Sequence, residues 1–283
     1  MFSCPICGSK ETKKSLKIKD FSVSKETFFV WLCKNCDVSF STPYMSKKNL
    51  LNYYDQKNYP SFGFKSFSVF GFFYNLTRFF NTKYKFKQIK PLVFSSLLDY
   101  GSGNGYFSKY CRKKGIQAYD YEPINNSLSS KNQINDLMSF SIKNNPFSVI
   151  TLWHVLEHTN SPKKTLLNLK KILHVKGHII VALPNKNSYD SIYYKNYWAG
   201  YDVPRHRFHF NPLSFGVLCK LCGFSIVKSF PLFFDVFYVS YLSEKYKKNS
   251  FSFLKGFIIG LLSNKFAKRS RNYSSLVYIL KLK

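Results

Sequence analysis

Three alternating glycines in the middle of the chain have the spacing of a nucleotide-binding turn. The segment LLDYGSGNG, residues 97–105, places Gly101, Gly103 and Gly105 after Asp99. Glycines let the backbone approach a ligand closely, and this turn follows an apolar run typical of a buried strand. A dinucleotide fingerprint would place its third glycine one residue later, where the chain has a tyrosine. The spacing favours a nucleotide-type ligand and counts against NAD.

A carboxylate follows at the end of the next expected strand. Residues 117–121 are mostly apolar and lead into Glu122 and Pro123. In doubly wound sheets, an acid at this place can accept hydrogen bonds from both hydroxyls of a ribose. A tight turn followed by an ordinary surface glutamate would explain the acid less well, because three alternating glycines precede it. We therefore expect Glu122 to bind the ribose of a cofactor.

Two Cys-x-x-Cys pairs near the start of the chain have the spacing of a zinc site. Cys4 and Cys7 form the first pair, and Cys33 and Cys36 form the second. Four thiolates complete a closed tetrahedral site, which is structural and not catalytic. A segment of about forty residues has too small a core to fold unaided, so the metal would supply stability. A third pair, at residues 219–222, falls on an expected helix without a partner pair and is interpreted as core thiols.

Strands and helices are expected to alternate after the glycine turn, which predicts parallel strands joined by helical crossovers. We predict an α/β fold with a doubly wound, mostly parallel sheet and a small N-terminal zinc ribbon. The expected domains are a zinc module over residues 1–43, a helical linker or cap over 44–90, and a main domain over 91–283 with a helical insertion at about 231–270. The expected strands cover residues 93–100, 117–121, 147–153, 177–183, 224–230 and 275–282, and the expected helices cover 106–114, 162–173 and 213–222.

Five motifs in order resemble the class I S-adenosylmethionine-dependent methyltransferases, in particular the branch related to ubiquinone-type and sugar methyltransferases. The motifs are LLDYGSGNG, AYDYEP, FSVITLWHVLEH, LKKILHVKGHIIVALPN and YDVPRHRFHFNPLSFGVLCKLCGF. The resemblance covers residues 97–230 and implies a Rossmann-like, seven-stranded sheet whose last strand is antiparallel. A similar zinc module precedes some sugar methyltransferases.

The resemblance also implies which residues surround S-adenosylmethionine. Glu122 would hold the ribose, and Trp153 and His154 would border the cofactor after the fourth strand. The chain departs from the family at Ser148, where relatives usually have aspartate, and the acid near the adenine is represented only by Asp136. The residues implied around the methionine end belong to the glycine turn, namely Asp99, Gly101, Ser102, Gly103 and Gly105.

Histidines supply the candidate catalytic groups. Methyl transfer from a sulfonium depends mainly on holding donor and acceptor in line, and a base is needed only for a weak nucleophile. His154, His206 and His209 are the candidate bases, and the arginines beside His206 are candidate anion ligands or loop contacts. The motif HVLEH also spells a zinc-protease pattern, but its position directly after an apolar strand argues against a protease helix.

The chain carries 43 Lys and Arg against 14 Asp and Glu, a net charge of +29. This excess favours a polyanionic partner, nucleic acid or an anionic membrane, although a biased composition that scatters lysines over the surface would also produce it. The acceptor expected first is a small molecule or a carrier-linked one such as a lipid-linked glycan. The expected chemical class is a sugar, glycan or polar metabolite, methylated on oxygen or carbon. An RNA methyltransferase and a non-catalytic cofactor-binding scaffold are the alternatives, and the oligomeric state is left open.

Residues 251–271 combine an apolar helical face with basic residues and are expected either to pack on the domain or to lie on a membrane surface. The sequence has no recognisable secretion leader, and no run reaches the ~18 apolar residues that span a bilayer. We expect a cytoplasmic protein, with peripheral membrane contact if the helix binds lipid.

Overall fold

The computed structural model describes residues 2–46, 49–50, 52–54, 69–123, 132–143 and 146–283. Part of the linker or cap expected at residues 44–90 lies outside the described residues. The first elements in chain order are β1 (Thr12–Lys19), β2 (Thr27–Cys33), β3 (Ser39–Thr42), α2 (Val69–Ile89), β4 (Leu97–Tyr100), α3 (Tyr106–Lys113), β5 (Ala118–Tyr121), α4 (Leu137–Lys143), β6 (Phe147–Trp153) and α5 (Pro162–Ile172). The later elements are β7 (Leu173–Pro184), α6 (Tyr189–Tyr194), β8 (Phe208–His209), α7 (Pro212–Leu221), β9 (Phe224–Pro231), α8 (Asp235–Tyr246), α9 (Ser252–Ser270) and β10 (Ser275–Leu282).

The main sheet confirms the expected mostly parallel α/β fold. Its strand order is β5-β4-β6-β7-β10-β9, with parallel pairs from β5 to β7 and with β10 antiparallel to both of its neighbours. Within the described residues the sheet has six strands and not the expected seven. Beyond β5, Gln133 forms an isolated parallel bridge to Asp120, and a single bridge is too short to count as a strand.

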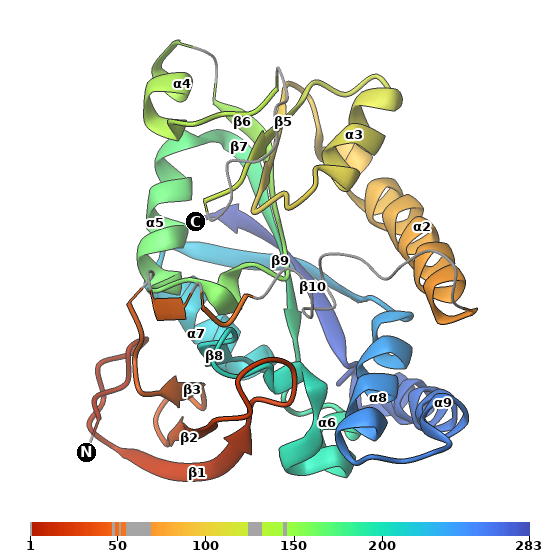
Figure 1. Cartoon of the computed structure of the whole chain (residues 1–283). Helices are drawn as coiled ribbons and strands as arrows, with labels where there is room; N and C mark the ends of the chain where they lie inside the picture. Colours follow the sequence, from red (N-terminus) through yellow and green to blue (C-terminus); the bar gives the residue numbers. More distant parts are fainter. Residues whose placement is uncertain (1, 47–48, 51, 55–68, 124–131, 144–145) are drawn as a thin grey trace.

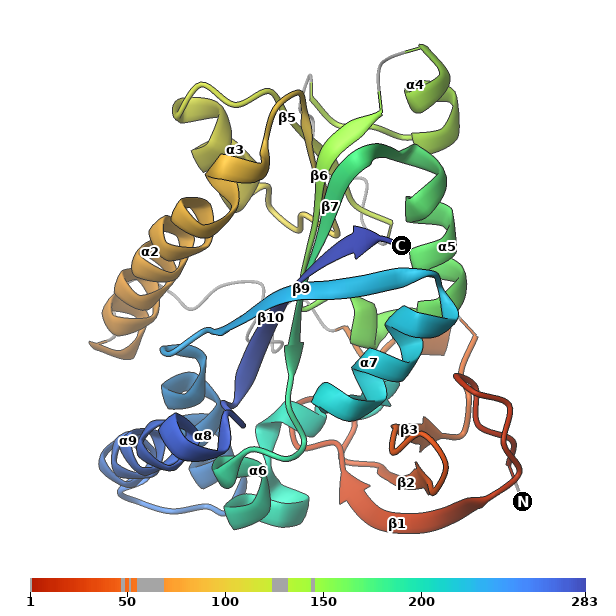
Figure 2. The same ribbon diagram turned by 180° about the vertical axis from the view of Figure 1, so that it is seen from behind.

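Both faces of this sheet are covered by helices, as Figures 1 and 2 show. Helices α2 and α3 lie on one face, where Val149 and Ile180 join a core with Phe86 and Phe107. Helices α4, α5 and α7 lie on the other face, where the alternate strand residues meet Leu166 and the rest of a larger core. Strand β6 is therefore buried along almost its whole length and is mostly apolar, because successive side chains enter two different cores.

The N-terminal segment forms a second, antiparallel sheet that is completed by the main domain. Its order is β1-β2-β3-β8, and β8 pairs with β3 through Phe208 with Phe40 and His209 with Ser39. The cysteine-bearing segment therefore shares backbone hydrogen bonds with a strand that lies between α6 and α7 in the chain.

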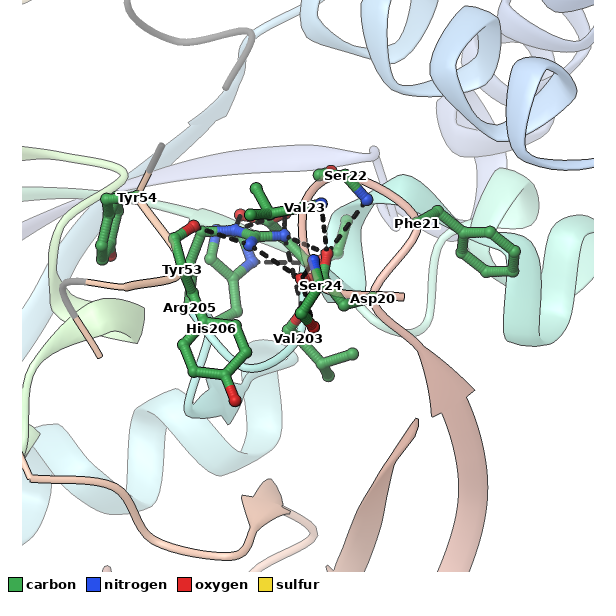
Figure 3. A network of polar contacts seen from close by, with 12 residues as sticks. Asp20, Phe21, Ser22, Val23, Ser24, Tyr53, Tyr54, Val203, Arg205 and His206 are labelled. Atoms are coloured by element: carbon green, nitrogen blue, oxygen red, sulfur yellow. Dashed lines mark hydrogen bonds and ion pairs between the residues drawn. The ribbon is translucent and has the colours of Figure 1, made fainter. Parts of the chain in front are cut away.

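A buried ion network joins the same two parts of the chain (Figure 3). Arg205 Nη2 donates to Asp20 Oδ1 at 2.8 Å and to Asp202 Oδ1 at 2.8 Å, and Nη1 donates to the Tyr53 carbonyl at 3.0 Å. Both Asp20 and Arg205 are 1% exposed. Of the two roles considered for Arg205 from sequence, anion ligand or loop contact, its geometry is that of the loop contact.

Helices α8 and α9 form a hairpin at one end of the sheet (Figure 1). A Cβ added to Gly256 would lie 2.8 Å from the backbone of Tyr241, so the small residues of α9 allow close contact with α8. Within the described residues, no helix is both long enough and apolar enough to cross a membrane.

The Asp20→Asn variant should lose about 3 kcal/mol of unfolding free energy at neutral pH, because it leaves part of the buried Arg205 charge uncompensated. Burial alone would raise the pKa of Asp20, but the hydrogen bonds and charge of Arg205 lower it overall. This stabilisation is complete above the pKa of the unfolded state and is lost as the pH falls through the lower folded-state pKa. Urea unfolding across this acid range measures the effect.

The matched control is Glu11→Gln, because Glu11 is an exposed acid of the same N-terminal segment. Its unfolding free energy should stay within about 0.5 kcal/mol of wild type. Equal losses in the two variants would show that the network does not join the two parts of the chain.

Candidate functional site

The glycine turn lies at the carboxyl end of β4 and bends back toward the end of β5. The amides of Gly101 and Ser102 donate to the Tyr121 carbonyl at 2.7 and 3.2 Å, and the Gly103 amide donates to Glu122 Oε2 at 2.9 Å. The structure thus places Glu122 directly beside the turn, as the spacing in the sequence predicts. The arrangement provides a backbone turn with a carboxylate at its rim.

Two of the turn's glycines show why side chains are excluded. Gly101 has a φ of +74°, and an added Cβ would lie 2.5 Å from a methyl group of Val155. Gly103 has a φ of +56°, and an added Cβ would meet no atom within 4 Å. Gly101 is therefore packed against the protein, whereas Gly103 borders open space in the described structure, where a ligand can approach the backbone.

Two buried aspartates, Asp99 and Asp120, make hydrogen bonds next to the glycine turn. Asp99 accepts a hydrogen bond from Thr151 Oγ1 at 2.7 Å, and burial raises the pKa of Asp99 to about 7. Asp120, which the sequence analysis did not single out, accepts from Ser108 Oγ and from Arg112 Nη1, the latter at 2.9 Å. Asp120 thereby fixes the start of α3 against β5. The feature of the sequence that could have identified Asp120 is its position two residues before Glu122.

Helix α2 covers the turn with two basic residues that the sequence analysis missed. Arg78 Nη2 donates to Asn104 Oδ1 at 2.8 Å, and its guanidinium lies 4.0 Å from the centre of the Tyr106 ring. Lys85 Nζ lies 4.4 Å from the centre of the Trp153 ring, and burial lowers the pKa of Lys85. No short motif marks these residues, because their role depends on how α2 packs.

Trp153 and His154 end β6 beside the turn. The Trp153 ring packs edge-on against Phe107 at 5.1 Å, and its buried Nε1 has no hydrogen-bond partner among the described residues. His154 Nε2 lies 3.0 Å from Asp235 Oδ2, and its Nδ1 lies 3.4 Å from Glu157 Oε1. Asp235 comes from α8, so the insertion contributes to this site.

The environment of His154 favours its charged form. Burial alone would lower the pKa of His154, but its contacts with Asp235 and Glu157 outweigh burial and raise the pKa to about 9. Both ring nitrogens face carboxylates, so the imidazole is protonated at neutral pH. To act as a base, His154 would first have to lose this proton.

The other two candidate histidines belong to the segment 206–209, which ends in β8. His209 is buried in β8 with Nε2 2.9 Å from Ser41 Oγ, and burial holds its pKa well below the ordinary value. His206 is also buried, with Nδ1 2.8 Å from the Gly200 carbonyl and its ring 4.4 Å from that of His158. His206 and His154 thus both lie next to Glu157, whereas His209 is directed toward Ser41.

Asp136, the weak candidate for the adenine contact, caps the start of α4. It accepts hydrogen bonds from the Met138 amide at 3.0 Å and from Ser139 Oγ at 2.6 Å. These bonds lower the pKa of Asp136, with the hydroxyl of Ser139 contributing most. Its described hydrogen bonds all lie within α4 and do not reach the glycine turn, so its contact with a cofactor stays a prediction.

The four N-terminal cysteines converge on one point. Their sulfur atoms lie within 4.8 Å of one another, with 3.6 Å between Cys4 and Cys36 and between Cys7 and Cys33. Thiolates at the corners of a tetrahedron around zinc, each about 2.3 Å from the ion, are separated by about 3.8 Å. The donor set and its spacing therefore fit a tetrahedral metal ion.

Known proteins resemble this chain in family and in fold. A family model described as "Methyltransferase domain" matches residues 74–229. Magnesium protoporphyrin IX methyltransferase from Synechocystis PCC 6803, solved with bound SAH, shares 12% identity, with 84% of this chain and 100% of that chain covered and a TM-score of 0.50. A SAM-dependent methyltransferase from Archaeoglobus fulgidus shares 18% identity, with coverage of 76% and 100% and a TM-score of 0.46. No curated protein matches the chain.

Proposed function

Because the chain belongs to the methyltransferase-domain family, whose members use S-adenosylmethionine, we propose that it methylates an oxygen or carbon of a glycan or polar metabolite carried on a lipid. The observation that supports the cofactor site best is the hydrogen bond from the Gly103 amide to Glu122. It joins the open part of the glycine turn to a carboxylate at the end of the neighbouring strand. This arrangement suits a nucleoside whose ribose hydroxyls reach the acid.

The residues around the turn have separate roles in this proposal. S-adenosylmethionine, when bound, supplies an electrophilic methyl group on a sulfonium. Glu122 accepts hydrogen bonds from the ribose, the backbone of the turn follows the methionine end, and Trp153 borders the cofactor. Asp99 and Asp120 hold the turn in place without contacting the acceptor.

Positioning contributes more than proton transfer to this reaction. Both nitrogens of His154 are occupied by Asp235 and Glu157, so His154 is proposed to link α8 to the end of β6 and not to accept the acceptor's proton. Lys85 over Trp153 helps to close the same side of the site. Holding donor and acceptor together is a large part of the catalysis available to a methyltransferase.

The four cysteines are proposed to hold structural zinc. Four thiolates leave no coordination position open, so the ion would stabilise the small sheet and take no part in methyl transfer. The small sheet has few strands of its own and borrows β8 from the main domain. A metal ion would stabilise the end of this sheet that carries the cysteines.

A lipid-linked acceptor is favoured by the surface of α9. This helix buries mostly small residues on the side of α8 and exposes six large apolar ones, with a seventh at its N-cap, the reverse of an ordinary surface helix. The exposed set is Phe251, Phe253, Leu254, Phe257, Ile258, Leu261 and Phe266. Residues 245–271 contain eight Lys and Arg and no acid, so the charge complements an anionic bilayer.

This apolar surface continues toward the candidate site. The rings of Phe80 on α2 and Phe234 lie 6.3 Å apart, and both are exposed. Phe234 directly precedes Asp235, which contacts His154. An acceptor anchored in the bilayer would thus meet the protein close to the residues proposed to position it.

The Glu122→Ala variant should bind S-adenosylhomocysteine at least tenfold more weakly than wild type, because it removes a carboxylate that accepts hydrogen bonds from the ribose. Isothermal titration calorimetry measures the affinity, and Glu11→Ala is the control. Circular dichroism should show an unchanged fold. Equal affinity in wild type and Glu122→Ala would remove the ribose assignment.

Incubation of the full chain with methyl-labelled S-adenosylmethionine and cell extract tests the acceptor class. We expect the label to resist nuclease and to enter a fraction extracted by organic solvent, because a lipid carrier partitions there. The control reaction uses heat-treated enzyme. Nuclease-sensitive label would instead identify RNA, and label in water-soluble metabolites would exclude the lipid carrier.

Flotation with vesicles of anionic lipid tests the α9 surface. The triple variant Phe253→Ser, Leu254→Ser, Phe257→Ser should lose most vesicle binding, since each substitution removes apolar area available for burial in the interface. The matched control is Val175→Ser, which changes an exposed apolar residue far along the chain from α9. Equal flotation of the two variants would exclude α9 as the lipid-binding surface.

A further inference from the structure

Three side chains converge beside the candidate site without a role in the proposed chemistry. Glu157, His158 and His206 each offer one ligand atom, and these atoms lie within 4.8 Å of one another. We propose that they bind a divalent first-row transition-metal ion at a site distinct from the four cysteines. Two imidazoles and one carboxylate are a ligand set that such ions use in proteins.

Glu157 supplies the buried carboxylate of this cluster. Its side chain is 1% exposed, and neither carboxylate oxygen has a hydrogen-bond partner among the described residues. Among the described residues, its Oε1 makes an ion-pair contact of 3.4 Å with His154 Nδ1. The imidazolium of His154 compensates this buried carboxylate from one side only, and Oε2 has no partner among the described residues. A bound cation would satisfy that second oxygen.

The two imidazoles are oriented as metal ligands usually are. His206 Nδ1 lies 2.8 Å from the Gly200 carbonyl, and because a carbonyl can only accept, this nitrogen carries the hydrogen. Its Nε2 therefore keeps a lone pair. His158 Nδ1 lies 3.0 Å from the Tyr54 hydroxyl, which can donate or accept, so His158 presents Nε2 in the same way when that hydroxyl accepts. Metal-binding histidines are commonly fixed by a hydrogen bond at the other ring nitrogen.

These ligands differ from the ones that the HVLEH motif suggests. In the protease pattern, His154 and His158 would share one ion from successive turns of a helix. Here His154 has a φ of +56° and contacts Asp235, while His158 and Glu157 lie in the short 3₁₀ turn η3 (Leu156–His158). The second imidazole comes from His206, in the loop before β8.

The proposed metal site adjoins the glycine turn, so a bound ion would lie near the methyl acceptor. Val155 packs against Gly101, and the turn η3 follows directly. Three protein ligands leave at least one coordination position open. A role for the ion in the reaction rests on the proposed function, since an acceptor hydroxyl bound at that position would become more acidic. The ion would then do for the acceptor what His154 is poorly placed to do as a base.

Titration of metal-free full-length chain with Co²⁺, followed by optical absorption, tests the proposal. We expect two equivalents to bind. One carries the intense thiolate-to-cobalt bands of the cysteine site, and the other carries only the weaker bands of nitrogen and oxygen ligands. Glu157→Gln and His206→Asn should each lose the second equivalent and keep the first. His174→Asn, which changes a histidine outside the cluster, should keep both.

Two results would overturn the proposal. One is a wild-type chain in which all bound Co²⁺ shows thiolate-to-cobalt bands, so that no second equivalent with only nitrogen and oxygen ligands is present. This result decides the question even if the variants fold poorly. The other is a Co²⁺ equivalent without thiolate bands that still binds to both Glu157→Gln and His206→Asn. Calorimetry with S-adenosylhomocysteine on the same samples keeps the two proposals separate, because loss of metal with intact nucleoside binding contradicts only the metal site.

Discussion

Parallel strands end at a common edge, and the candidate site depends on this constraint. Tyr100 pairs with Tyr121 and Asp99 pairs with Thr151, so β4, β5 and β6 are held in register where they end. The glycine turn, Glu122 and His154 each follow one of these strands. Backbone hydrogen bonds of the sheet therefore bring together groups that lie far apart in the sequence.

Elements outside the sheet close the site from two directions. Helix α2 places Arg78 against Asn104 of the turn and Lys85 over the Trp153 ring, and α8 brings Asp235 to His154. The N-terminal sheet is attached on another side through β8 and through the ion pair of Asp20 with Arg205. Both attachments of the N-terminal sheet, at β8 and at Arg205, lie near Glu157, because the Arg207 amide between them donates to the Glu157 carbonyl.

The sequence predicts the sheet better than it predicts the groups around it. Residues 147–153 and 275–282 coincide with the bounds of β6 and β10, because both strands are apolar along most of their length and bury both faces. Glu122 could be predicted because the glycine turn identifies the first strand, and the end of the following strand can then be located in the sequence. The seventh strand was expected from the family, and within the described residues only one bridge, at Gln133, stands there.

Groups whose role depends on packing between distant elements could not be predicted. Lys85 and Asp235 belong to helices with no recognisable motif, and only the fold brings them to Trp153 and His154. His206 and His209 are close in sequence, yet one faces His158 and the other faces Ser41. Arg205 offered the same difficulty, because nothing near it in the sequence identifies Asp20 as its buried partner.

The central claim is that the turn after β4 and the acid after β5 together enclose a nucleoside. Hydrogen–deuterium exchange of the wild-type chain with and without S-adenosylhomocysteine tests this most directly, since exchange locates the amides that a ligand covers. The account predicts slower exchange over residues 99–106 and 121–123 when the nucleoside is present. Unchanged exchange in both segments at saturating nucleoside would contradict it.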